Sequence, residues 1–277
     1  MNLASKEKYS INLLKQAENL ALEFSEDGYR LAFSGGKDSI VLYHLAQLAG
    51  VKFKPHMQVT TLDPPELMKY VRKNYSKVEL HRPEINFYEL IKKKKMLPLR
   101  QVRYCCQYLK EQSGANTVTL LGIRAAESLR RRNRNEVEIS SFKFSGNLDQ
   151  FNTIKETFHK CLNGKDKLLI SPILHWSNTD VWEYIRQNNI QYCDRYDNGY
   201  TRIGCMFCPM ASPKAKMLDR KNYPGVERQI KLSIQFIINN YGYMNNWTDD
   251  VDEVFDWWIS NMEQREFFGK KNQIKLF

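Results

Sequence analysis

The sequence lacks several features that define common protein classes. No run approaches the ~18 consecutive apolar residues of a membrane-spanning helix, and the N-terminal residues contain no apolar signal core. Internal repeats and low-complexity segments are absent, and no Ser/His/Asp or Cys/His nucleophilic arrangement is recognisable. These absences lead us to expect a cytoplasmic protein that does not associate with membranes.

Acidic residues are outnumbered by basic ones. Of 277 residues, 42 are Lys or Arg and 31 are Asp or Glu, which gives a net charge of +11. Two dense basic runs occupy residues 92–95 and 130–134. Such runs are usually solvated faces, but they also suit an anionic partner, either a multiply charged nucleotide or a nucleic acid. Charge alone does not choose between these interpretations.

The most informative stretch follows the apolar-leaning run 29–33. It reads Ser34, Gly35, Gly36, Lys37, Asp38 and Ser39. Glycines let a backbone approach a ligand closely. The apolar helix expected from residue 40 would add free N–H groups and the positive end of its dipole. We therefore predict a phosphate-binding loop, with Lys37 as a point charge and with Asp38 and Ser39 capping the helix.

The order of residues in this loop excludes the common P-loop. That pattern needs four residues between its first glycine and Gly-Lys-Ser/Thr, whereas here the two glycines are adjacent and Asp38 separates Lys37 from Ser39. The hexapeptide resembles the PP-loop of the adenine nucleotide alpha-hydrolase superfamily, whose members bind ATP or an adenylylated sulfate. The alternative is a plain Ser/Gly turn that caps a helix.

Strand and helix patterns alternate from residue 29 to about 190. Strands are expected at 53–62, 78–80, 117–123 and 168–173. This alternation predicts an α/β fold with a doubly wound, mainly parallel sheet. Ligands bind beyond the carboxyl ends of such strands, where residues 34–39, 60–63 and 122–127 fall. We expect a nucleotide-binding domain over 1–210 and a helical C-terminal appendage over 211–277.

Four of the six cysteines form two pairs, Cys105 with Cys106 and Cys205 with Cys208. The Cys-x-x-Cys spacing places two thiolates on one side of a turn, which is half of a metal site. Adjacent helical residues point about 100° apart, so the tandem pair favours a large target or a distorted helix. We predict a [4Fe–4S] cluster, with zinc and unmetallated thiols as alternatives. The lone Cys161 and Cys193 are interpreted as ordinary buried residues.

The loop, the cysteine pairs and two further segments together resemble the phosphoadenosine/adenosine phosphosulfate (PAPS/APS) reductase family over residues 28–210. The segments are 61–66 and 122–128. The resemblance implies that Thr61, Asp63, Gly122 and Arg124 join residues 34–39 in binding the nucleotide, with Arg124 facing the anionic group. Asp63 suits ribose or Mg²⁺, or simply a turn. The cluster implies the APS-type branch, and a reductase implies an electron donor such as thioredoxin.

One departure from the family concerns its nucleophile. The reductases carry a further cysteine near the C-terminus, and this sequence has none after Cys208. Three hypotheses stay open. The first is an APS- or PAPS-dependent enzyme of sulfur metabolism. The second is an enzyme that adenylates tRNA or DNA with ATP, releases pyrophosphate and inserts sulfur. The third is a nucleotide- or nucleic-acid-binding module without catalysis.

Overall fold

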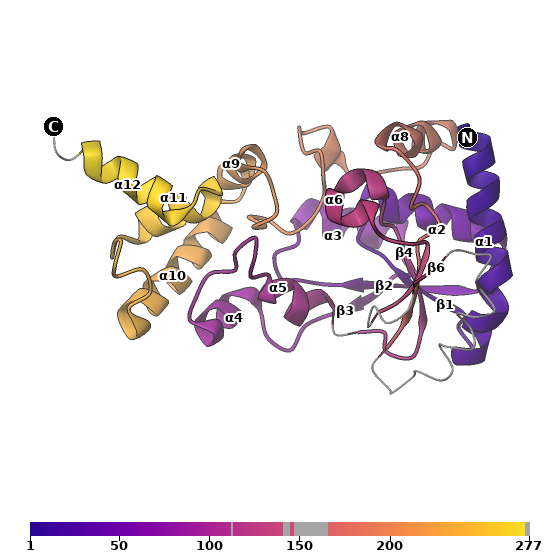
Figure 1. Cartoon of the computed structure of the whole chain (residues 1–277), viewed down its shortest axis with the longest axis horizontal. Coiled ribbons are helices and arrows are strands. Elements are labelled where there is room, and N and C mark those ends of the chain that lie inside the picture. Colours follow the sequence, from indigo (N-terminus) through magenta and orange to yellow (C-terminus); the bar gives the residue numbers. More distant parts are fainter. Residues whose placement is uncertain (112, 141–144, 147–165, 275–277) are drawn as a thin grey trace. The chain divides into compact units, whose positions relative to one another are not determined.

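The computed structural model describes residues 1–111, 113–140, 145–146 and 166–274 (Figure 1). Within them the chain forms two compact units. Unit 1 draws on residues 1–58, 65–81 and 112–203, and unit 2 draws on residues 59–64, 82–111 and 204–277. Cys161 lies outside the described residues, whereas Cys193 is buried, as predicted.

Unit 1 is built on a sheet that has seven strands within the described residues. They are β1 (Tyr29–Ala32), β2 (Phe53–Gln58), β3 (Glu79–His81), β4 (Val118–Leu121), β5 (Val137–Ile139), β6 (Ser145–Gly146) and β7 (Leu168–Ile170). Their order is β3-β2-β1-β4-β7-β5-β6. The first five in this order are parallel, and β5 is antiparallel to β7 and to β6. The predicted mainly parallel α/β fold is confirmed.

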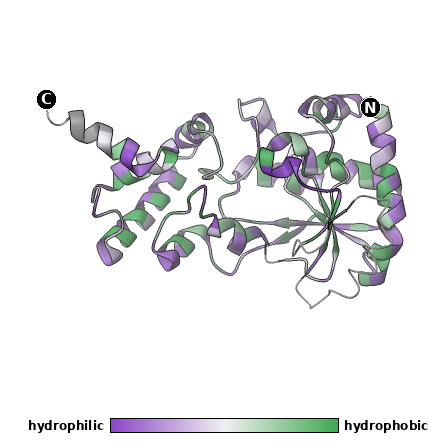
Figure 2. Cartoon of the chain, in the orientation of Figure 1, coloured by the Kyte–Doolittle hydropathy of each residue, from purple (hydrophilic) through white to green (hydrophobic). Residues whose placement is uncertain are grey.

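Unit 1 has five α-helices in its described residues, and the longer ones bury apolar residues in the core that includes the sheet. The five are α1 (Leu3–Phe24), α2 (Lys37–Ala49), α3 (Pro65–Asn74), α6 (Leu129–Arg132) and α8 (Asn178–Gln187). In Figure 2, α1 alternates between hydrophobic and hydrophilic residues, because one of its faces packs on the core that includes Tyr29 and Leu31. Among the described residues, no helix combines the length and the apolar character needed to span a membrane.

Unit 2 is helical and has its own core. Its helices are α4 (Phe87–Lys94), α5 (Tyr104–Cys106), α9 (Pro213–Asn222), α10 (Pro224–Tyr241), α11 (Val251–Ser260) and α12 (Gln264–Ile274). This division differs from the expected boundary at residue 210. The reason is packing: Leu90 and Ile91 of α4 share a core with Ile230 and Ile234 of α10. Residues 59–64 and 82–111 therefore belong with the C-terminal helices.

The topology fixes where a ligand of unit 1 would bind. After β1, the chain adds β2 and then β3 on one side of β1. It then returns and adds β4, with β7 beyond it, on the other side. Ligands of doubly wound sheets bind where the strand order reverses, outside the carboxyl ends of the strands. In unit 1 the reversal lies between β1 and β4, and the loops that leave these two strands are residues 33–36 and 122–124.

Candidate functional site

The loop after β1 has a backbone that only glycine accommodates well. Gly35 has φ of +69°, in the left-handed region, and a Cβ there would lie 2.6 Å from Leu67 Cδ1 and 2.9 Å from Val71 Cγ2. Gly36 is the N-cap of α2 and offers no side chain to the first turn. The predicted capping by Asp38 and Ser39 is therefore wrong, since the Ser39 hydroxyl donates to the Gly36 carbonyl oxygen at 2.9 Å. The helix therefore begins without a side-chain cap from its own first turn.

Replacing Gly35 with alanine is expected to lower the free energy of unfolding by about 2–4 kcal/mol. The left-handed backbone costs about 1–2 kcal/mol for an alanine, and the clash with Leu67 and Val71 adds an overpacking penalty because both are buried. Gly50 is the matched control: its φ is also +69°, but nothing lies within 4 Å of a Cβ there. Urea unfolding should show a smaller loss for Gly50→Ala, and equal losses would contradict the close packing at Gly35.

Asp38 lies between two buried cations at the start of α2. Its Oδ1 accepts from Arg124 Nε at 2.6 Å, and its Oδ2 accepts from Lys37 Nζ at 3.2 Å. Arg124 is 3% exposed and Lys37 is 5% exposed. Burial lowers the pKa of Lys37, and the charge of Asp38 opposes this shift. One carboxylate shared by two buried cations leaves an excess of positive charge, which an anionic ligand would compensate.

Two more arginines extend this positive region. The pKa of Lys37 is lowered mainly by burial. The nearby charge of Arg202 lowers it further. Burial, followed by the charge of Arg202, also lowers the pKa of Arg131. Arg131 pairs with Glu127, whose carboxylate also accepts from the Arg124 backbone N–H at 3.0 Å. Four cations thus surround two carboxylates. A multiply charged phosphate or sulfate ester fits this arrangement.

Gly122 brings the end of β4 against the start of α2. A Cβ at this position would lie 3.0 Å from the Asp38 carbonyl oxygen and 3.2 Å from the Ser39 nitrogen. The absence of a side chain therefore lets the two loops touch. The structure brings Gly122 and Arg124 together with residues 34–39, as the sequence predicted. Their role in nucleotide binding stays a prediction.

Tyr196 belongs to the same region and was missed by sequence reasoning. Its hydroxyl accepts from the Lys37 backbone N–H at 2.8 Å, which links the start of α2 to a short 3₁₀ turn at residues 194–196. Burial raises the pKa of Tyr196, so the phenol stays protonated at neutral pH. The two residues are 159 positions apart, and no local pattern could have paired them.

Thr61 and Asp63 lie in unit 2. Strand β2 ends at Gln58, so the expected strand over 53–62 is too long, and both residues follow it in a loop. Thr61 has φ of +64°, and its hydroxyl accepts from the Phe87 backbone N–H at 3.0 Å. The Asp63 carboxylate accepts from the Thr60 backbone N–H at 2.6 Å. These bonds give Asp63 the turn role that the sequence left open; a nucleotide contact by either residue stays a prediction.

All four paired cysteines lie in unit 2. Phe207, inside the Cys-x-x-Cys turn, has φ of +52°, and its N–H donates to the buried Asp219 carboxylate at 2.9 Å. The Met206 N–H donates to the Leu62 carbonyl oxygen at 2.8 Å. The Cys205 thiol donates to Thr60 Oγ1 at 3.3 Å. Backbone and side-chain bonds therefore hold this cysteine pair on the loop that also contains Asp63.

The tandem cysteines sit where the helix is distorted. The short α5 continues into a π-helical turn, Gln107–Glu111, so the helix that carries the tandem cysteines is distorted just after Cys106. Such widened turns are frequent at functional sites. In the described part of the chain, no three of the cysteine sulfurs lie within 4.8 Å of one another. Tetrahedral zinc, with Zn–S of about 2.3 Å, would set the sulfurs about 3.8 Å apart. The tandem pair on a distorted helix suits a cluster, which is larger than a single ion.

The four thiols share one electrostatic environment with Lys110. A hydrogen bond with Cys106, then burial and the charges of the other thiols, raise the pKa of Cys105. The hydrogen bond from Cys105 lowers the pKa of Cys106. Negative charge on Cys205, followed by that on Asp63, raises the pKa of Lys110. Lys110 was not predicted, although its place one helical turn after Cys106 was a usable signal.

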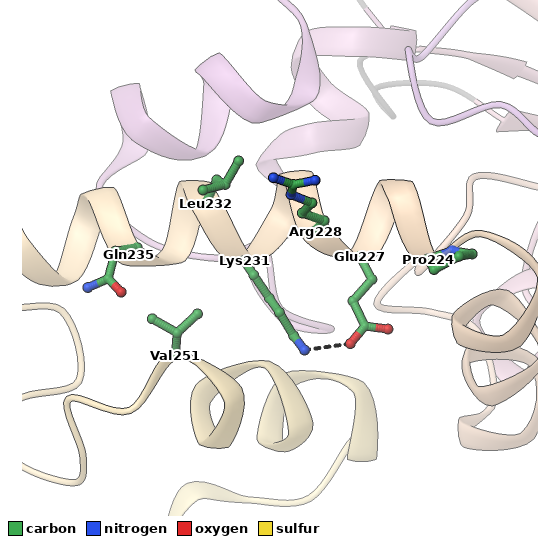
Figure 3. A pocket seen from close by; sticks show the side chains of 7 residues that line it. All are labelled: Pro224, Glu227, Arg228, Lys231, Leu232, Gln235 and Val251. Atoms are coloured by element: carbon green, nitrogen blue, oxygen red, sulfur yellow. Dashed lines mark ion pairs between the residues drawn. The ribbon is translucent and has the colours of Figure 1, made fainter.

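A shallow groove of about 480 Å³ lies on unit 2, beside α10 and the start of α11 (Figure 3). Its lining includes the pair formed by Lys231 and Glu227, whose charged atoms are 2.6 Å apart. None of the predicted site residues lines it. We therefore assign it no part in the chemistry.

Known proteins resemble this chain over most of its length. An uncharacterized protein of Methanocaldococcus jannaschii is 27% identical over 79% of this chain, which spans 50% of that protein. An adenosine 5'-phosphosulfate reductase of Lysinibacillus sphaericus is 28% identical over 69% of this chain and 78% of its own length. A probable FAD synthase of Schizosaccharomyces pombe is 27% identical over 68% of this chain and 63% of its own length.

The family comparison agrees with the motifs. Residues 28–211 match the phosphoadenosine phosphosulfate reductase domain. The match begins just before β1 and ends just beyond Cys208, so it includes the glycine loop, Arg124 and both cysteine pairs. The resemblance drawn from the sequence is confirmed: this chain belongs to the phosphoadenosine phosphosulfate reductase domain family.

Proposed function

We propose that the chain is an enzyme of sulfur metabolism that binds APS or PAPS and releases its sulfonate group. The observation that carries this proposal is the excess of buried positive charge around Asp38, at the start of α2. It lies where the strand order of the sheet reverses, the usual place for a nucleotide. The similarity to an APS reductase supports the same ligand class.

Each residue of the site has a role in this proposal. Gly35 and Gly36 let the backbone approach the phosphate, and the first turn of α2 offers N–H groups. Asp38 fixes the plane of the Arg124 guanidinium through Nε. Arg124 and Lys37 would stabilise the negative charge that grows on the phosphate when the sulfur–oxygen bond breaks. Tyr196 holds the start of α2 in place.

The four cysteines of unit 2 are the residues that would hold a [4Fe–4S] cluster. When bound, such a cluster supplies redox-active iron and a concentrated charge in its surroundings. Lys110 would neutralise part of the negative charge of the thiolates, because its ammonium group is already stabilised by Cys205 and Asp63. Zinc is the alternative occupant, and we place it second because the tandem cysteines lie on a distorted helix that suits a larger group.

The proposed reaction needs a thiolate nucleophile, and we propose that another protein supplies it. The thiolate attacks the sulfur, AMP leaves from APS with the bridging oxygen, and an S-sulfonate forms. A second thiol then releases sulfite and leaves a disulfide, so two electrons come from the dithiol. Cys193 is a poor nucleophile because it is 1% exposed and burial raises its pKa. A protein dithiol such as thioredoxin would suit the proposed reaction.

A second candidate keeps the loop and changes the bond that breaks. ATP, carried with Mg²⁺, would transfer its adenylyl group to an acceptor and release pyrophosphate. Two observations favour this candidate: the sequence has no cysteine after Cys208, and its net charge of +11 suits a nucleic-acid acceptor. The similarity to a FAD synthase is compatible with adenylyl transfer.

Product analysis distinguishes the candidates. The chain, purified without oxygen, is incubated separately with APS, PAPS and ATP in the presence of a small dithiol and of tRNA or DNA as an acceptor. We expect AMP and sulfite from APS, or adenosine bisphosphate and sulfite from PAPS, and no pyrophosphate. Pyrophosphate from ATP alone would overturn the first candidate in favour of the second. Tight nucleotide binding without any product would leave only a binding module.

A further inference from the structure

Three side chains that the proposed function does not use lie together at the edge of the sheet in unit 1. His56 is on β2, and Glu79 and His81 are on β3, which is the edge strand. The strands are parallel, with His56 in register with Glu79 and Gln58 in register with His81. Residues two apart on a strand share a face, so the two imidazoles and the carboxylate project from the same face of the sheet.

Their ligand atoms all lie within 4.8 Å of one another, which allows them to reach one metal ion. His56 Nδ1 lies 2.8 Å from His81 Nε2 and 3.5 Å from Glu79 Oε2, and His81 Nε2 lies 3.9 Å from Glu79 Oε1. Ligands held about 2.1 Å from a tetrahedral ion are about 3.4 Å apart, and the three separations bracket this value. The two rings are stacked, with their centroids 5.0 Å apart.

A second observation at the same place is an unsatisfied polar atom. The Gln58 side-chain nitrogen is buried and has no hydrogen-bond partner among the described residues. Gln58 is the next residue of β2 on the face that carries His56, and it is in register with His81. A water on a bound ion would supply the oxygen acceptor that this nitrogen lacks.

Positive charge close to this site would repel a bound metal ion. Lys54 Nζ lies 3.2 Å from Glu79 Oε2 and 3.5 Å from Asp27 Oδ2, so it competes for the carboxylate. Lys54 and Glu79 are each about half exposed, with side-chain exposures of 45%. A surface pair of this kind contributes little stability, so a divalent ion can displace the ammonium from Glu79.

We propose that His56, Glu79 and His81 form a binding site for a divalent transition-metal ion of the zinc class. Two imidazoles and one carboxylate are ligands that zinc accepts, with a fourth position left for water. The set contains no thiol and lies in unit 1, so it is separate from the cysteines of unit 2. Because the ligands come from β2 and β3, the ion would fasten the edge strand to the sheet.

Zinc binding by the full-length chain tests this site. After chelator treatment and removal of the chelator, wild type and variants are dialysed against a zinc series, and the bound zinc per chain and the thermal midpoint are measured. We expect wild type to bind one zinc more than the double variant His56→Ala/His81→Ala. Glu79→Gln should bind that ion at least about 10-fold more weakly. Zinc should raise the midpoint of wild type more than that of the double variant.

Two control variants distinguish loss of the metal site from loss of folding. His175 has a 69% exposed side chain outside the site, and His175→Ala should bind zinc as wild type does. Lys54→Gln should bind zinc more tightly, because it removes the ammonium that competes for Glu79; a variant that merely unfolds cannot show such a gain. Equal zinc content in wild type and the double variant, or no gain in Lys54→Gln, would overturn the proposal.

Discussion

Arg124→Ala is expected to weaken binding of APS or PAPS by roughly 100-fold, because a hydrogen bond from a charged donor contributes about 1.5–3 kcal/mol to the binding free energy.

The same change affects stability, because it leaves Asp38 with one cationic partner instead of two. Breaking a buried pair typically costs 3–5 kcal/mol. Asp38 keeps Lys37 and is 16% exposed, so we expect a loss of only about 2 kcal/mol in unfolding free energy. Calorimetric titration and urea unfolding measure the two effects.

Two variants separate lost binding from lost folding. Arg130 is exposed, and Arg130→Ala should leave both nucleotide affinity and stability close to wild type. Arg124→Lys keeps a cation beside Asp38 and should recover much of the stability, but it should recover little affinity, because lysine lacks the planar guanidinium that binds an anion through two bonds. Unchanged nucleotide affinity in Arg124→Ala would contradict the proposed site.

Cys205→Ser is expected to remove nearly all iron and acid-labile sulfide from the anaerobically purified chain. Wild type should carry about four irons per chain and absorb broadly in the visible range, as a [4Fe–4S] protein does. Cys205 is anchored by its bond to Thr60, so a serine would keep the loop but lose a thiolate ligand. Because metal binding and folding are coupled, unit 2 should also unfold at a lower temperature.

Cys193→Ala is the matched control for the cysteine change. Cys193 is buried in the core of unit 1, so its replacement should cost some stability and leave the iron content unchanged. Zinc in place of iron in wild type, with that zinc lost in Cys205→Ser, would reject the cluster and keep the cysteines as ligands. Wild type that folds without either metal would reject both.

The parts of the site that could be predicted from the sequence are those formed by residues close together in the chain. The glycine loop follows a strand and precedes a helix, and each cysteine pair is close in sequence, so spacing alone indicated their chemistry. Arg124 was predicted because it lies in the segment 122–128 that resembles the family, just after the predicted strand that became β4. Alternation of strands and helices was enough to predict the fold class, because parallel strands require crossover connections.

The parts that the sequence did not predict depend on contacts between distant residues. Tyr196 reaches Lys37 across 159 positions, and Asp38 meets Arg124 across 86. Strand β5 was missed because it has three residues, one of which is the buried Glu138 paired with Arg134. The assignment of residues 82–111 to unit 2 follows from the packing of α4 on α10, which no local pattern specifies.

The most direct test of the central claim is a structure of the chain with APS bound, determined without any thiol that could react. We predict that the phosphate lies against the backbone of Gly35 and Gly36 at the start of α2, and that the sulfate faces Arg124. A nucleotide bound elsewhere in the chain, with the cations around Asp38 free of ligand, would contradict this account.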